Sequence, residues 1–329
     1  MTQWLINSWY KPQPIRWLLW PLSLVYQAIL LVRNGLFRAG IFKQHRLPVP
    51  VIIVGNITVG GTGKTPFVIW LAHQLQQAGY RPGIISRGYG GKAESYPQKV
   101  MPDSEPSIVG DEPIIISRHT MCPMVVAPDR HSAGETLLQD YDCNVIISDD
   151  GLQHYALNRD IEIVIIDGQR QFGNQLCLPA GPLREPLSRL KHVDFIVENQ
   201  GSASENYTMI LSQLHAINLA DPSKTRPLSS FSGQNVHAIA GIGNPQRFFE
   251  QLSSQGLRVM SHAFDDHHPF QAQDLNFDDN QPILMTEKDA VKCQRFANSN
   301  TWYIPIEATI SGKLNQHILQ KLAGITPNG

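Results

Sequence analysis

Short runs of aliphatic and β-branched residues recur along the chain, and helical patterns lie between most of them. The run PVIIV at residues 50–54 is typical of a strand buried in a parallel sheet. Equivalent runs predict strands at 51–54, 82–86, 124–127, 144–148, 161–167, 193–198, 236–240, 257–263, 282–286 and 302–306. This alternation predicts an α/β fold, with a mainly parallel sheet and helices on both of its faces.

The chain of 329 residues exceeds the usual size of one domain. A stretch rich in Ser, Asn and Pro separates two groups of predicted strands, and a fresh strand–loop–helix unit begins at residue 235. We therefore expect a hydrophobic and basic N-terminal segment, a nucleotide-binding core, a linker and a smaller C-terminal α/β lobe, at residues 1–46, 47–200, 201–234 and 235–329.

The N-terminal segment carries an apolar run of about 16 residues, from Trp17 to Val32, which Pro21 interrupts. A spanning helix needs ~20 apolar residues, so the run is short for one. Tryptophan favours the membrane–water interface, and basic residues flank the run. These features predict a helix or broken helix that lies in a bilayer surface. The alternative is a helix packed on the protein's own core, and both hold if one face packs and another meets lipid.

The net charge of −1 hides an asymmetry along the chain. No Asp or Glu precedes Glu94, whereas ten Lys and Arg residues do. A basic, acid-free N-terminal third indicates an anionic partner, which is phosphate, phospholipid or nucleic acid. The four cysteines are scattered, as is typical of reduced thiols in a cytoplasmic protein.

The motif TVGGTGKT at residues 58–65 follows the first strand and precedes a helical pattern. Strand, glycine loop and helix form the context of a phosphate-binding P-loop. Glycines at 60, 61 and 63 let successive N–H groups turn toward phosphates, and the helix N-terminus adds partial positive charge. Lys64 is expected to reach the β- and γ-phosphate oxygens, and Thr65 to offer its hydroxyl to Mg²⁺.

The loop departs from the usual GxxxxGK[ST] pattern because Thr58 stands where the first glycine is expected. It resembles the loops of dimerising ATPases, which carry a lysine where this chain has Val59. The missing lysine argues against that ATPase mechanism.

A second acidic component is expected at the end of another buried strand. The run NVIIS at residues 144–148 leads directly into Asp149 and Asp150. An apolar strand that delivers a carboxylate to the sheet edge beside a P-loop is a Walker B pattern, suited to Mg²⁺ or to positioning water. Without the P-loop, the pair would be interpreted as a solvated turn.

Other polar clusters leave alternatives open. Arg87 ends a predicted strand in IISRGYGG, where it could hold a phosphate or lie in a surface turn. Asp111 of GDEP could cap a helix or accept a proton from an attacking hydroxyl, and spacing alone favours the cap. His154 follows the acidic pair in DDGLQH. His267, in FDDHHPF, is suited equally to a metal site and to tuning a catalytic carboxylate.

The motifs GNITVGGTGKTP, SRGYGG, GDEP, APDR, SDDGLQH, LPAGPLREP, DHH and TEKDAVK, in this order, resemble the tetraacyldisaccharide 4′-kinase family. The resemblance covers essentially the whole chain, including the hydrophobic N-terminus. It implies transfer of the γ-phosphoryl group of ATP to the 4′-hydroxyl of a tetraacylated glucosamine disaccharide 1-phosphate. It also implies a place on the cytoplasmic face of the inner membrane, and we expect no nucleic-acid partner and no obligate protein partner.

The resemblance also implies roles for matched residues. Asp111 falls on the proposed catalytic base, which a histidine matched by His267 supports. The residues matched to ATP binding are Thr58, Gly60, Gly61, Thr62, Gly63, Lys64, Thr65 and, in the nucleoside-side loop, Glu185. The residues matched to Mg²⁺ are Thr65, Asp149 and Asp150. Those matched to the lipid head group are Arg87, Arg130 and His154.

Two rival functions stay open. One is a membrane-associated P-loop ATPase or GTPase that acts as a switch or assembly factor, although no NKxD guanine-binding motif is evident. The other is an anionic-lipid binder with a vestigial P-loop, against which the intact Lys64 and Thr65 argue.

Overall fold

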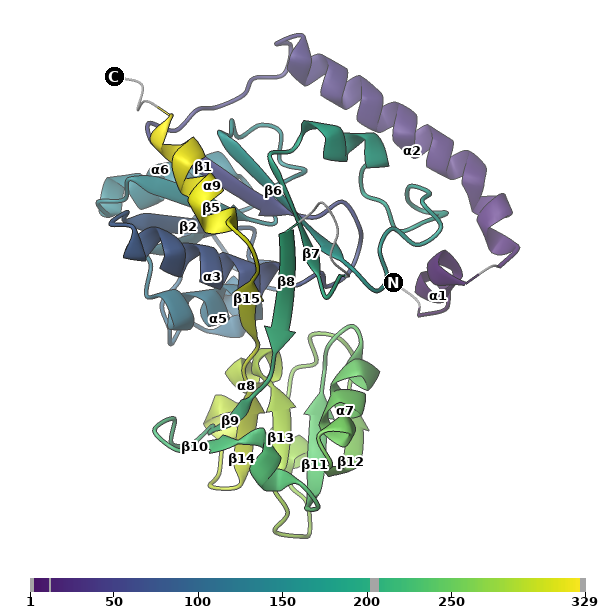
Figure 1. Ribbon diagram of the computed structural model, residues 1–329, viewed down its shortest axis with the longest axis vertical. Helices are drawn as coiled ribbons and strands as arrows, with labels where there is room; N and C mark the ends of the chain where they lie inside the picture. Colours follow the sequence, from purple (N-terminus) through teal and green to yellow (C-terminus); the bar gives the residue numbers. More distant parts are fainter. Residues whose placement is uncertain (1–2, 12, 202–206, 326–329) are drawn as a thin grey trace.

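A computed structural model describes residues 3–11, 13–201 and 207–325 and shows two α/β lobes, each built around its own sheet (Figure 1). The first sheet has nine strands in the order β15–β8–β7–β6–β1–β5–β2–β4–β3. Only β3 and β15 at its two edges pair antiparallel with their neighbours. Its strands are β1 (Val51–Gly55), β2 (Pro82–Ser86), β3 (Gln98–Lys99), β4 (Met124–Val126), β5 (Val145–Asp149), β6 (Ile161–Asp167), β7 (Phe195–Asn199), β8 (Tyr207–Ser212) and β15 (Glu307–Ile310).

Both faces of this sheet are covered, which the unbroken apolar runs predicted. Ile52 and Val54 of β1 pack into one hydrophobic cluster, with residues of α3, α5 and α9. Val51 and Ile53 point into a second cluster, with residues of α6. The helices of this lobe are α3 (Lys64–Gln77), α4 (Pro106–Val109), α5 (Asp111–Thr120), α6 (Arg130–Asp140), the 3₁₀ helix η1 (Leu187–His192) and α9 (Leu314–Ala323).

The central strands run parallel, so their carboxyl ends meet at one edge of the sheet. Val54 of β1 lies beside Asp149 of β5, and Ile85 of β2 beside Ser148. The P-loop, Arg87 and the acidic pair therefore all leave the sheet at the same edge.

The second lobe contains a six-stranded sheet in the order β10–β9–β14–β13–β11–β12. Its strands are β9 (His215–Asn218), β10 (Thr225–Pro227), β11 (Asn235–Ala240), β12 (Arg258–Ala263), β13 (Ile283–Thr286) and β14 (Thr301–Ile304). Its helices are α7 (Pro245–Ser254), α8 (Glu287–Cys293) and the 3₁₀ helices η2 (Leu228–Phe231), η3 (Ala272–Leu275) and η4 (Gln294–Phe296). The chain passes between the lobes from β8 to β9 and returns from β14 to β15 (Figure 1).

This pairing assigns residues outside the predicted C-terminal lobe to its sheet. Of the segment expected as a linker, residues 207–212 belong to the first sheet, and 215–218 and 225–227 to the second. Residues 202–206 lie outside the described part of the chain. The domain boundaries stay a prediction.

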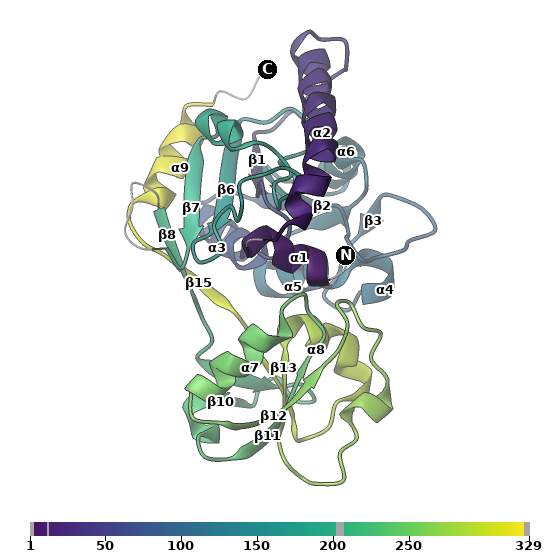
Figure 2. The same ribbon diagram turned by 90° about the vertical axis from the view of Figure 1, so that its right-hand side faces the viewer.

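The N-terminal residues form α1 (Gln3–Tyr10) and α2 (Ile15–Arg38), and α2 runs along the outside of the first lobe (Figures 1 and 2). Among the described residues, α2 is the one helix long and apolar enough to cross a membrane. Its Trp17 and Leu18 side chains are 66% and 74% exposed. Its opposite face holds Ser23, which is fully buried, and Tyr26. The helix therefore packs with one side and leaves an apolar side uncovered, so the two interpretations of this segment are compatible.

Buried polar contacts fasten α2 to the loop that contains LPAGPLREP. The Ser23 hydroxyl donates to the Cys177 carbonyl at 2.8 Å and accepts from the Ala180 N–H at 3.0 Å. The Tyr26 hydroxyl donates to the Arg184 carbonyl at 2.9 Å. These contacts fix the rotation of α2 about its own axis, and with it the direction that the apolar side faces.

Ser23→Ala removes both hydrogen bonds and takes away the acceptor of the buried Ala180 N–H, so it is expected to destabilise the protein by about 1–3 kcal/mol. Urea unfolding of the full chain in detergent measures the loss. Leu22→Ala, at the exposed neighbouring position, is the control and is expected to cost less than about 0.5 kcal/mol. Equal stability of the two variants would show that Ser23 does not hold the helix.

Candidate active site

The P-loop connects β1 to α3 and turns with two glycines in the left-handed region. Gly60 has φ 109° and Gly63 has φ 93°, values that L side chains rarely adopt. Lys64 begins α3, and its ammonium lies 3.3 Å from Asn56 Oδ1 and 3.5 Å from Asp150 Oδ1. Thr65 follows in the first turn of the helix. The structure thus places the predicted lysine and threonine at the carboxyl edge of the sheet.

The acidic pair ends β5, one strand away from the P-loop. Asp149 is 2% exposed and accepts a hydrogen bond from the Ser86 hydroxyl at 3.2 Å. Burial, followed by the charges of Glu112 and Asp150, raises the pKa of Asp149 to about 7. Burial alone would raise the pKa of Asp150 too, but Lys64 and Arg184 outweigh it and hold that pKa below its ordinary value. The two carboxylates therefore have different partners and different affinities for a proton.

The acidic pair fits a magnesium ion that phosphates help to hold. Among residues 3–11, 13–201 and 207–325, no three His, Cys, Asp or Glu side chains converge as a complete metal cage. Mg²⁺ usually takes one or two carboxylates plus substrate phosphates and water. Asp149 Oδ1 is buried without a hydrogen-bond partner among the described residues. A buried carboxylate oxygen of this kind beside the P-loop matches what the ion requires.

Asp111 and His267 meet across the two lobes. Asp111 is the first residue of α5, and His267 follows β12 in the second lobe. His267 Nδ1 lies 3.2 Å from Asp111 Oδ1. Gly110 occupies the N-cap position, and no side chain caps this helix, so Asp111 does not serve as the cap that spacing favoured.

The contact between Asp111 and His267 shifts the pKa values of both groups toward their ionised forms. The hydrogen bond with Asp111 raises the pKa of His267 above its ordinary value. Burial alone would raise the pKa of Asp111, but the hydrogen bond from His267 and the charges of Lys288 and Lys292 hold it below its ordinary value. A carboxylate in this state can accept a hydrogen bond from a hydroxyl and then its proton.

Glu112 connects the dyad to the phosphate site. It forms an ion pair with Lys288 of α8, and Lys64 also lowers its pKa against the effect of burial. Its own charge raises the pKa of Asp149. Glu112, which directly follows Asp111, therefore lies within electrostatic reach of both the P-loop lysine and Asp149.

The three residues matched to the lipid head group gather beside the same acids. Arg130 is 4% exposed, donates to the carbonyls of Ala127 and Pro128, and keeps Nε buried without a partner among the described residues. Burial lowers its pKa to about 10, and Arg87 adds to the effect. His154 Nε2 lies 3.6 Å from Asp129, and burial and Arg130 lower its pKa. Two arginines and an imidazole thus form a basic corner suited to an anionic group.

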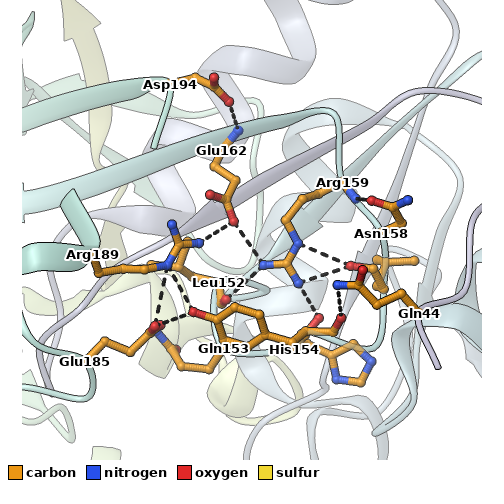
Figure 3. Close-up of polar contacts among 12 residues, drawn as sticks. Gln44, Leu152, Gln153, His154, Asn158, Arg159, Glu162, Glu185, Arg189 and Asp194 are labelled. Atoms are coloured by element: carbon orange, nitrogen blue, oxygen red, sulfur yellow. Dashed lines mark hydrogen bonds and ion pairs between the residues drawn. The ribbon is translucent and has the colours of Figure 1, made fainter. Parts of the chain in front are cut away.

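Glu185 lies in a buried network rather than on an open surface (Figure 3). It is 1% exposed; Oε1 accepts from Gln153 Nε2 at 2.9 Å, and Oε2 accepts from the Tyr155 hydroxyl at 2.5 Å. Arg159 donates to the carbonyls of Leu152, His154 and Leu157, which holds the turn after the acidic pair. In this arrangement both Glu185 oxygens support protein side chains. A nucleoside contact for Glu185 stays a prediction.

The structure adds residues that sequence motifs alone did not assign. Arg184 donates to both Asp150 oxygens, at 3.1 and 3.2 Å, and Ser86 holds Asp149. Glu112 and Lys292 join the dyad region. All four lie inside motifs that the sequence singled out, so motif membership was the available signal, whereas their partners come from distant segments.

Nucleotide binding alone does not require a proton acceptor beside the phosphates, whereas transfer to a hydroxyl does. With this acceptor at the carboxyl edge of a P-loop sheet, the fold and the site define a P-loop kinase. The chain belongs to the tetraacyldisaccharide-1-P 4′-kinase family, whose model matches residues 15–323.

Similar proteins cover nearly the whole chain. The tetraacyldisaccharide 4′-kinase of Nitrosococcus oceani is 53% identical over 97% of this chain and 94% of its own. That of Pasteurella multocida is 52% identical over 96% of this chain and 98% of its own. A crystal structure of LpxK from Aquifex aeolicus in complex with ATP has a TM-score of 0.80 and 29% identity, over 94% of this chain and 99% of that one. These matches confirm the fold class and the family predicted from the motifs.

His267→Gln is expected to move the acid limb of the pH–rate profile upward by about one pH unit. The hydrogen bond from His267 lowers the pKa of Asp111, so its loss lets that pKa rise and the carboxylate protonates at higher pH. The shift is measured as steady-state kcat from roughly pH 4 to pH 9, a range that covers the titration of carboxyl and imidazole groups. His268→Gln, whose partner is Asp274, is the control. An unmoved acid limb would rule out the dyad.

Proposed function

We propose that this chain transfers the γ-phosphoryl group of ATP to the 4′-hydroxyl of a tetraacylated glucosamine disaccharide 1-phosphate, which yields lipid IVA. The observation that carries the proposal is the 3.2 Å contact between His267 Nδ1 and Asp111 Oδ1, at the start of a helix whose next residue, Glu112, lies within electrostatic reach of Lys64. The names of the relatives point to the same acceptor. The Aquifex aeolicus structure, whose title includes ATP, supports ATP as the donor.

The chemistry follows from charge and position. The N–H groups of the P-loop and Lys64 hold the β- and γ-phosphates, and Thr65 and Asp149 would hold Mg²⁺. When bound, Mg²⁺ would neutralise charge that develops on the phosphate oxygens. Asp111 accepts the proton of the sugar hydroxyl as the hydroxyl oxygen attacks the γ-phosphorus and ADP leaves, and His267 holds that carboxylate in place. Asp150 is anchored between Lys64 and Arg184, so it orients the site rather than exchanging protons.

Arg87, Arg130 and His154 are proposed to bind the anionic head group of the lipid. The Arg130 side chain is buried against backbone carbonyls of the preceding turn and lies within electrostatic reach of Asp149 and Asp150. A phosphate held there would accept a hydrogen bond from Arg130 Nε, which has no partner among the described residues. The disaccharide would then extend from this corner toward Asp111.

The uncovered side of α2 is proposed to lie in the cytoplasmic surface of the inner membrane, where ATP and an acylated substrate meet. Its exposed Trp17, Leu18 and Leu31 supply the apolar contact. Arg16 and Arg38 at its two ends suit anionic head groups. The anchors at Ser23 and Tyr26 favour a helix that lies on the surface over one that leaves the protein to cross it.

Asp111→Asn is expected to lower transfer by about 10²–10⁴-fold, the usual contribution of a general base. The measurement follows radiolabelled γ-phosphate from ATP into the disaccharide 1-phosphate in detergent micelles. Asp103→Asn changes an exposed carboxylate that precedes the GDEP motif in the sequence; it is the control and should retain activity. Near-normal kcat in Asp111→Asn would refute the base assignment, and nucleotide turnover without any labelled lipid would favour the ATPase alternative.

Trp17→Glu combined with Leu18→Glu is expected to weaken binding to anionic liposomes at least about tenfold, because two buried lipid contacts become charges. Cosedimentation measures the bound fraction. Met121→Glu changes an equally exposed apolar residue outside α2 and serves as the control. Unchanged binding by the double variant would place the membrane contact elsewhere.

A further inference from the structure

Side chains hold the carbonyl groups of three successive P-loop residues. The Gly60 carbonyl accepts from Asn56 Nδ2 at 3.4 Å, the Gly61 carbonyl from Arg170 Nη2 at 2.6 Å, and the Thr62 carbonyl from Asn199 Nδ2 at 3.1 Å. The donors stand at the carboxyl ends of β1, β6 and β7, which are neighbours in the first sheet. Each of these three carbonyls therefore accepts a hydrogen bond from a residue at the end of a different strand.

A carbonyl that is held in this way also fixes the next N–H group. The peptide unit is planar and trans, so the N–H of one residue points opposite to the C=O of the residue before it. Fixing the carbonyls of residues 60–62 therefore orients the N–H groups of Gly61, Thr62 and Gly63. In the described ranges, these three N–H groups donate to no other part of the chain. Successive N–H groups that point the same way form the nest that binds an anion.

Arg170 makes the shortest of the three contacts, and Asp167 holds its guanidinium in place. Its Nε donates to Asp167 Oδ2 at 2.9 Å, and Asp167 Oδ1 accepts the N–H groups of Gln169 and Arg170 at 3.0 Å each. Asp167 is 4% exposed at the end of β6. A Cβ at Gly60 would make ordinary van der Waals contact with Arg170 Nη1 at 3.4 Å, so the guanidinium lies directly against the loop.

We propose that Arg170 is a positioning residue for the nucleotide, which it serves by holding the Gly61 carbonyl so that the Thr62 N–H faces the phosphates. It acts through the P-loop backbone and not on the phosphoryl group that is transferred. The role rests on the proposed function only in that ATP is the donor, since nucleotide binding can be measured without a lipid acceptor. Asp167 is the anchor of Arg170, because it binds the guanidinium and the backbone of the same turn.

The test compares ATP and ADP binding by calorimetry with steady-state kinetics, on the full chain in detergent. Arg170→Gln is expected to raise the Kd of both nucleotides and the KM for ATP by about tenfold, the effect of losing one charged hydrogen bond. The KM for the lipid acceptor and the melting temperature without nucleotide should stay as in the parent. Arg170→Lys keeps one donor and should recover part of the affinity.

Arg247→Gln is the matched control, because Arg247 approaches the same Asp167 at 3.8 Å, whereas its hydrogen bond among the described residues goes to Gln200 and not to the P-loop. It should alter nucleotide affinity less than about twofold. Asp167→Asn gives a second way to release the guanidinium and should weaken both nucleotides in the same direction as Arg170→Gln.

Three results would overturn the proposal. Unchanged ATP and ADP affinities in both Arg170→Gln and Asp167→Asn would remove any role in the nest. Unchanged affinities with a large fall in kcat would mean that the guanidinium acts on the transferred group. A lower melting temperature with proportionate losses for both substrates would mean that Arg170 only stabilises the fold. Absence of lipid phosphorylation together with the expected affinity loss would instead contradict the proposed function and leave the role of Arg170 intact.

Discussion

The contact between Lys64 and Asp150 joins the two halves of the phosphate site. Lys64 belongs to the helix that follows β1, and Asp150 follows β5, the neighbouring strand. Asp150 adopts φ 48°, a backbone conformation that costs energy in most residues but that Asp tolerates. In this conformation its carboxylate lies between Lys64 and Arg184. The position of Lys64 therefore depends on the turn at Asp150, which three segments hold in place: the strand β5, the start of α3 and the loop that contains Arg184.

One of those segments, the loop that contains Arg184, is also bound to α2. Arg184 uses its guanidinium on Asp150 and its carbonyl on Tyr26 of α2. The buried Ser23 hydroxyl forms hydrogen bonds with the backbone of Cys177 and Ala180, earlier in the same loop. A continuous path of hydrogen bonds thus connects the helix with the apolar outer face to the acidic turn of the phosphate site. This arrangement keeps the phosphate site at a fixed place relative to the apolar outer face of α2.

The Asp111–His267 pair depends on the two lobes together. Asp111 comes from the first lobe and His267 from the segment after β12 in the second, and the Lys288–Glu112 ion pair also joins the two lobes, through α8 and α5. The phosphate site, in contrast, is built within the first lobe. Any change in the separation of the lobes would alter the dyad while the P-loop stays intact, so binding and transfer can respond differently to mutations at the lobe contact.

The sequence predicted the parts of the fold that are locally encoded. Buried parallel strands such as β1 and β5 are unbroken apolar runs, and each was predicted within a residue or two. The strands β8 and β15 were missed, because both are only half-buried and their mixed residues give no continuous apolar run; β15 forms one edge of the sheet and β8 lies next to it. Lys64, Asp149 and Asp150 were found for the same local reason, since strand and motif are adjacent in sequence.

Features that depend on distant partners could not be predicted in this way. Spacing favoured Asp111 as a helix cap, but Gly110 takes that position and the carboxylate meets an imidazole 156 residues away. The hydrogen bonds of Glu185 come from Gln153 and Tyr155, which lie in another motif, so this buried network could not be predicted from the loop, and a nucleoside contact for Glu185 stays a prediction. The fit of Arg170 against the P-loop depends on strand order, which no short motif contains.

The central claim is that the phosphate site and the dyad act together on an acceptor hydroxyl and not on water. The most direct test measures ADP release and lipid phosphorylation in the same reaction, with ATP, Mg²⁺ and the disaccharide 1-phosphate. The account predicts that the two products form in equal amounts and that ADP release nearly stops when the acceptor is left out. ADP release that continues at the same rate without acceptor would contradict it.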